Sequence, residues 1–269
     1  MRDTSRPLSF ARGARAVFDL SLEGMVWTRR TLLMGLLVGL PALVAVVYRV
    51  VLATHPEARL LPATDLYAVI VAVYWVRNVL PLVALFFATA LVADEVEGKT
   101  LTYLLTRPLT RQSILAGKFG AYVATTLVLT LPAVVLTFFV LQSARGWAAV
   151  GPAVGDLFRD LGVAALALVA YGAFFALLGV LLKRPVIPGL LFLYGWELLA
   201  NLPGYLPRFT LTAWLRSLIT HRPAEEGLAG LFQQVLPAGQ SLAVLVVASA
   251  AFVTAAAWIF STREYVLDQ

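Results

Sequence analysis

Few side chains in this sequence are of the types that carry out catalysis or hold metals. The 269 residues include no cysteine and only two histidines, His55 and His221. These counts exclude a cysteine nucleophile, a thiolate metal site and a histidine-built metal centre. The sequence contains neither H-E-x-x-H nor G-x-S-x-G, and Glu197 is the only carboxylate within an apolar run. An intramembrane protease or lipid transferase is therefore the weakest functional alternative, and no bound metal or cofactor is expected.

Two ionisable residues interrupt long apolar runs and are the main candidates for polar chemistry. They are Arg77 and Glu197, and each has an asparagine close by, Asn78 and Asn201. Ionisable groups inside a membrane are costly and usually have a partner or a water-filled path. One hypothesis is that Arg77 and Glu197 form an ion pair, or line a polar path together with the two asparagines. The alternative is that Arg77 extends toward the membrane surface and Glu197 bonds locally to backbone.

The tripeptide Gly98-Lys99-Thr100 invites comparison with a phosphate-binding loop. That loop requires G-x-x-x-x-G-K-[ST] between a strand and a helix. Here Ala93 occupies the first glycine position, and Asp94, Glu95 and Glu97 would repel phosphate. The chain is therefore not expected to bind ATP by itself.

The composition predicts a membrane protein. Hydrophobic residues make up 60% of the chain and charged residues only 13%, whereas soluble domains have about a quarter of their residues charged. The net charge of +6 fits cytoplasmic loops facing anionic lipid better than nucleic-acid binding. No apolar run shows the strict alternation of a transmembrane barrel strand.

Six apolar runs are candidates for membrane-spanning helices, which take about 20 residues each. They cover residues 31–53, 66–93, 119–141, 161–182, 186–202 and 241–260. The fold class is an all-α integral membrane protein, with residues 1–30 as a cytoplasmic tail and 31–269 as the six-helix domain. Gly35 and Gly39 form a G-x-x-x-G pair in the first run, which predicts close helix packing within one chain or a dimer seam.

The distribution of basic residues predicts the orientation. With the N-terminus inside, the inner segments hold 13 Lys and Arg residues and the outer segments hold 8. The excess favours an N-in, C-in arrangement. Residues 8–27 have helical apolar spacing and predict an amphipathic helix at the cytoplasmic interface. The outer segment 203–240 predicts a short helix resting on the outer surface, because Leu211, Trp214, Leu215 and Leu218 recur at helical spacing.

The inner segment 94–118 is dense in charges of both signs. Leu101, Leu104 and Leu105 share one helical face, Pro108 ends that helix, and Thr110 is placed to cap a second helix. The pattern predicts a rigid helix-turn-helix that projects into the cytoplasm. Such an element is suited to docking on a cytoplasmic partner.

This segment resembles the inner loop of permease subunits of type 2 ATP-binding-cassette exporters. The matching residues are Asp94, Glu97-Gly98, Thr100-Leu101, Leu104-Leu105, Arg107-Pro108, Arg111 and Gly117-Lys118. A weaker resemblance covers Trp196-Glu197, Asn201 to Gly204 and Leu211 to Leu218, in the fifth run and outer helix. Lys99 departs from the pattern, because many relatives read Glu-Gly-Thr directly; this affects the register of the first docking contact.

The resemblance implies a division of labour in the bacterial inner membrane. A separate cytoplasmic ATPase subunit would bind ATP and Mg, a second permease copy would complete the path, with a homodimer as the default, and the direction would be export. The implied docking residues are Glu95, Glu97, Gly98, Thr100, Leu101, Leu104, Arg107, Pro108 and Arg111. The alternative for these residues is that their charges only solvate the loop. The alternative function is a non-transporting scaffold, such as an immunity or assembly factor. Nothing in the sequence selects a substrate.

Overall fold

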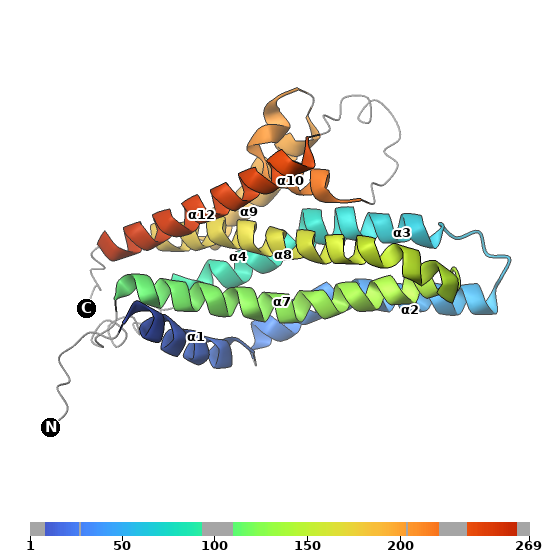
Figure 1. The fold of residues 1–269 in the computed structure, drawn as a ribbon, viewed down its shortest axis with the longest axis horizontal. Helices are drawn as coiled ribbons and strands as arrows, with labels where there is room; N and C mark the ends of the chain where they lie inside the picture. Colours follow the sequence, from blue (N-terminus) through green and yellow to red (C-terminus); the bar gives the residue numbers. More distant parts are fainter. Residues whose placement is uncertain (1–8, 27, 93–109, 203, 221–235, 263–269) are drawn as a thin grey trace.

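The computed structural model describes residues 9–26, 28–92, 110–202, 204–220 and 236–262. These residues form helices, and none of them lies in a strand. The helices run roughly along one axis (Figure 1). Both ends of the described chain lie at one end of this bundle, here called the terminal end. The turns at residues 55–62 and 144–149 lie at the opposite end, here called the loop end.

Five helical segments are long and apolar enough to cross a membrane. They are Arg29–Thr54, Ala63–Val92, Arg111–Ser143, Trp147–Leu181 and Ala238–Thr262. The expected span at 186–202 is instead a shorter apolar segment, Val186–Asn201. It consists of α9 (Val186–Tyr194) and the 3-10 helix η3 (Trp196–Asn201). At helical rise this segment covers about 24 Å, less than the roughly 30 Å of a hydrocarbon core.

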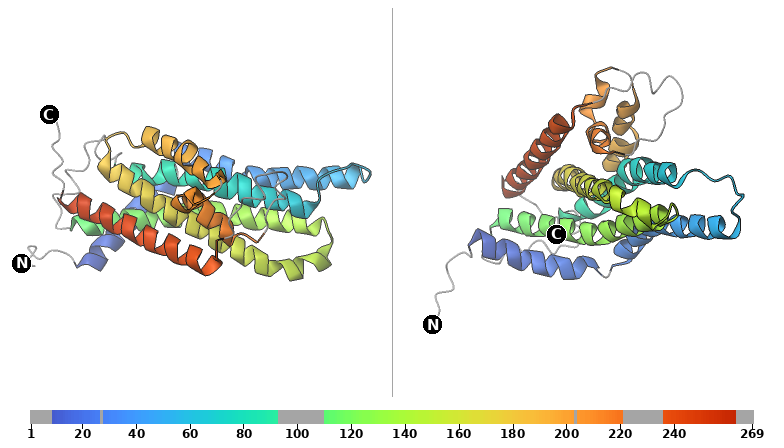
Figure 2. Two further views of the ribbon diagram at one scale, coloured as in Figure 1. Left: turned by 90° about the horizontal axis from the view of Figure 1, so that it is seen from above. Right: turned by 45° about the vertical axis from the view of Figure 1, so that its right-hand side comes forward.

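Helix α7 (Arg111–Ser143) lies at the centre of the bundle. It has 33 residues and contacts α1 (Phe10–Val26), α2 (Arg29–Thr54) and α8 (Val150–Leu181). Helix α8 in turn contacts α12 (Ala238–Thr262) on its other side. Figure 2 shows α1 and α12 on opposite sides of the bundle, with α7 and α8 between them.

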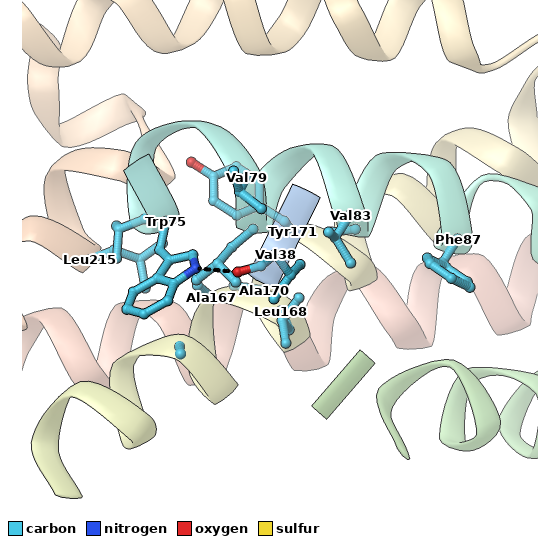
Figure 3. Close-up of a cluster of buried hydrophobic side chains, with 14 of the residues drawn as sticks. Val38, Trp75, Val79, Val83, Phe87, Ala167, Leu168, Ala170, Tyr171 and Leu215 are labelled. Carbon is cyan, nitrogen blue, oxygen red and sulfur yellow. Dashed lines mark hydrogen bonds between the residues drawn. The ribbon is translucent and has the colours of Figure 1, made fainter. Parts of the chain in front are cut away.

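The second membrane helix, Ala63–Val92, changes its winding in the middle. It begins as α3 (Ala63–Val69), continues as the π-helical segment η1 (Ile70–Val79) and returns to α4 (Leu80–Ala88). Trp75, Val79, Val83 and Phe87 lie along this helix in a cluster with buried side chains of α8 and α10 (Figure 3). Segments of π-helix are rare and often occur at functional sites.

This second membrane helix supplies a hydrogen-bond donor that is missing from the backbone of α2. Pro41 lies inside α2 and has no N–H, so the carbonyl of Leu37 loses its helical donor. The hydroxyl of Tyr74 donates to that carbonyl at 2.6 Å. The indole N–H of Trp75 donates to the next carbonyl, of Val38, at 3.4 Å (Figure 3). Tyr74 therefore supplies the donor that the proline removes, as apolar surroundings require, and Trp75 adds a second bond beside it.

Helix α1 packs directly on the first turns of α7. A side chain at Gly117 would collide with the carbonyl oxygen of Ala14 and lie 2.9 Å from Cβ of Val17. A side chain at Gly120 would lie 3.3 Å from the ring of Phe18. The two glycines therefore permit the backbones of α1 and α7 to approach closely. Phe10 and Leu20, on other faces of α1, remain exposed.

Helix α10 (Leu211–Leu218) lies within the segment 203–240, where the sequence predicts a short helix, and it packs along the bundle. The hydroxyls of Thr212 and Tyr171 are 2.8 Å apart, and Arg159 Nε donates to the Leu218 carbonyl at 2.8 Å. Because α8 runs from the loop end inward, these contacts place the start of α10 deeper than its end. Leu215 is fully buried. Polar bonds to α8 hold α10 there, and its spacing could not reveal them.

Candidate functional site

A pocket of about 270 Å³ opens between the π-helical segment, the short fifth segment and α10. The residues that line it are Val73, Arg77, Asn78, Leu193, Tyr194, Glu197, Leu198 and Thr212. Three of the four polar residues expected from the sequence, Arg77, Asn78 and Glu197, therefore meet at one place. Asn201 does not line the pocket, and its side-chain oxygen accepts from Arg216 Nη1 at 3.1 Å.

Glu197 is buried and holds the start of α10. Its Oε1 accepts from the backbone N–H of Leu211 at 3.1 Å, and its Oε2 accepts from that of Thr212 at 3.0 Å. The first N–H groups of a helix have no helical acceptor, so the carboxylate satisfies two of them. The partial positive charge of the helix start also offsets the negative charge of the carboxylate. Glu197 thereby links η3 to α10.

Arg77 and Asn78 supply the opposite wall of the pocket. Arg77 is exposed and lies near the middle of the helix Ala63–Val92. In the part of the chain that the structure describes, no ion pair joins Arg77 to Glu197, whose oxygens face α10. Asn78 donates through Nδ2 to the carbonyl of Val73 at 2.7 Å, which leaves its second N–H for another acceptor.

Sequence reasoning missed Thr212 and Tyr171, which connect the pocket to α8. Their hydroxyls are 2.8 Å apart and both residues are buried. The available signal was Tyr171 within an uncharged run, because a buried phenol usually needs a hydrogen-bond partner. No sequence feature distinguishes Tyr194 and the apolar lining residues, because residues of the same types are common on lipid-facing helices.

Most of the expected docking residues lie outside the described residues. They are Glu95, Glu97, Gly98, Thr100, Leu101, Leu104, Arg107 and Pro108. Arg111 begins α7, and its Nη1 donates to the carbonyl of Ser261, near the end of α12, at 3.5 Å. Thr110 caps α7 by accepting from the Ser113 N–H at 3.3 Å, which confirms the expected cap.

The two glycines of α2 have different surroundings. A side chain at Gly35 would lie 3.2 Å from Leu129 Cδ1, so Gly35 packs toward α7. A side chain at Gly39 would meet nothing within 4 Å. Leu36 and Leu43 are 72% and 63% exposed, so this stretch of α2 presents uncovered apolar surface.

Among the described residues, no group of three or more acidic, cysteine or histidine side chains could hold a metal ion. The arrangement is a polar pocket within apolar helices, with α1 packed on the first turns of α7. A family model described as ABC-2 family transporter protein matches residues 28–265. A search among curated proteins finds no match.

Proposed function

The chain belongs to the ABC-2 family of transporter proteins, and from this membership we propose that it is a permease subunit that exports its cargo with energy from a separate ATPase. The family match covers residues 28–265 and therefore includes every helix with the length and composition of a membrane span. This single observation carries the proposal. ATP and Mg²⁺ would bind to the ATPase subunit, and this chain would supply the path through the membrane. The membrane would be the bacterial inner membrane.

The ATPase would dock at the terminal end of the bundle. The second membrane helix ends at that end of the bundle and α7 begins there, and the segment 94–109 comes between them in the sequence. Helix α1 packs on the same end of α7. A displacement of the docking segment would therefore reach α7 directly, and α1 would move with it.

A second copy of this chain would complete the path. The uncovered apolar face of α2 around Gly39 supports a helix-helix contact, because a small residue permits close approach of a partner helix. Gly35 faces α7 within the same chain and would not take part.

The proposal is tested by purifying the tagged protein from its native membrane and identifying the proteins that accompany it. We expect a cytoplasmic ABC ATPase with the wild-type chain, and its loss when Glu97 and Arg107 are both changed to alanine. The matched control changes Glu57 and Arg59 to alanine. This pair has the same charges but lies in the turn between α2 and α3.

The control variant should retain the ATPase. If mild crosslinking recovers no ATPase with the wild-type chain, the permease proposal is overturned and the scaffold function takes its place. If the ATPase is retained by the Glu97 and Arg107 double variant, docking occurs through other residues and the assignment of the loop is overturned.

A further inference from the structure

Arg77 is a cation within a membrane helix that no ion pair neutralises in the described part of the chain. It is exposed on the wall of the pocket and lies near the middle of the helix Ala63–Val92. A charged group at such a position is expensive, and proteins retain one mainly where it has a partner or a function. Glu197 is the one acidic residue among those that line the pocket.

Glu197 is already occupied by α10. Each of its carboxylate oxygens accepts a backbone N–H bond, at 3.1 and 3.0 Å, at the positively polarised start of that helix. Its charge is therefore largely offset by the protein itself. The guanidinium of Arg77 consequently gives this pocket a positive character, which Asn78 increases with its second N–H donor.

The rest of the pocket is apolar. Val73, Leu193 and Leu198 line it, and Val73 and Leu198 are exposed at its rim together with Tyr194. A volume of about 270 Å³ holds roughly nine water molecules at about 30 Å³ each. That is room for a small head group and not for a whole lipid, whose chain would lie along the apolar rim.

We propose that this pocket binds the anionic head group of an amphiphile, with its phosphate or carboxylate held by Arg77 and Asn78. The planar guanidinium can donate two parallel hydrogen bonds to either anion. The apolar rim favours an attached hydrocarbon chain over a free anion. That the amphiphile is the cargo rests on the permease function proposed above; the binding itself does not.

The test measures binding of lysophosphatidylglycerol and lysophosphatidylcholine with the same acyl chain to the full protein in a neutral detergent. The wild-type chain should prefer the anionic lipid. Arg77→Gln should weaken binding of the anionic lipid by about tenfold or more, because the loss of one charge-assisted hydrogen bond alone accounts for about tenfold. Arg77→Lys, which keeps the charge, should retain most of the preference.

The matched control is Arg208→Gln. Arg208 is also exposed, lies over the Tyr205 ring at 5.0 Å, and does not line the pocket. This variant should bind both lipids as the wild type does. Thermal unfolding midpoints close to that of the wild type will show that each variant is folded.

Three outcomes would overturn the inference. Equal affinity for the two lipids would remove the head-group preference. A preference that survives Arg77→Gln would mean that Arg77 only extends toward the membrane surface. If free glycerol phosphate displaced the bound lipid as effectively as added lysolipid does, the ligand of the pocket would be a soluble anion and not an amphiphile. Because this assay contains no ATPase, its result is independent of the copurification test.

Discussion

The carboxylate of Glu197 is buried, and both of its oxygens accept backbone N–H bonds from the start of α10. A buried carboxylate is tolerated when hydrogen bonds replace its lost hydration. Here the bonds also determine where α10 begins to pack against the bundle. A single residue thus provides a pocket wall and fixes the neighbouring helix that completes it.

Replacing Glu197 with alanine should lower the free energy of unfolding by about 1–3 kcal/mol, because two N–H groups lose a charged acceptor. Glu197→Gln should have a smaller effect, since its amide oxygen can still accept one of these bonds. Denaturant unfolding in detergent is the measurement. Glu57→Ala is the control, since Glu57 is exposed and should change little. Unchanged stability in Glu197→Ala would contradict the capping role.

At this scale the sequence identified the residues better than their partners. Arg77 and Glu197 stand out because charge within an apolar run is rare, and they do line one pocket. No pattern in the sequence places Leu211 and Thr212 against Glu197. Those bonds join backbone groups to a side chain about fourteen residues earlier, and backbone donors carry no residue type.

Helix α1 illustrates the limit of periodicity at the scale of elements. Its apolar spacing predicts an amphipathic helix. The same spacing occurs in helices that pack on lipid and in helices that pack on protein, so it does not distinguish the two. In the structure Val17 is buried against α7, whereas Phe10 and Leu20 on other faces of α1 are exposed. The sequence signal for protein packing is the pair Gly117 and Gly120, one turn apart at the start of α7.

Gly117→Leu should separate α1 from α7, because the added side chain would collide with the Ala14 carbonyl. The natural chain has no cysteine, so a single cysteine at Val17 reports on this contact. We expect maleimide to react slowly with Val17→Cys alone and at least several times faster when Gly117→Leu is added.

Gly162→Leu is the matched control, because a side chain there meets nothing within 4 Å. It should leave the rate at Val17→Cys unchanged. Equal rates in all three proteins would show that α1 does not depend on close approach at Gly117.

The whole molecule has two distinct ends. Helix α1 begins and α12 ends at the terminal end, and the turns at 55–62 and 144–149 lie at the loop end. The sequence predicted the helical class and most spans because apolar runs of that length have few other structures in a membrane. It counted the fifth run as a full span because composition does not reveal the break at Gly195, where α9 ends.

The charge distribution predicts that the terminal end faces the cytoplasm. Single cysteines at Ala148 and Leu182 test this, since both positions are exposed and lie beside opposite ends of α8. Neither change alters the number of lysine or arginine residues. In intact cells a membrane-impermeant maleimide should label Ala148→Cys and spare Leu182→Cys. Labelling of Leu182→Cys alone would show that the terminal end faces the outside of the cell.

The length of α7 allows a small tilt of this helix to produce a larger displacement at its far end. With 33 residues it is about 50 Å long at 1.5 Å per residue, well beyond the roughly 30 Å hydrocarbon core. If one end is held, a tilt of about 5° carries the other end about 4 Å sideways. Helix α1 packs on the first turns of α7, and the charge distribution predicts that this end faces the cytoplasm. We therefore expect a push on these turns to tilt α7 as a lever. In that orientation, a small tilt on the cytoplasmic side would become a sideways displacement of about 4 Å at the far side of the membrane.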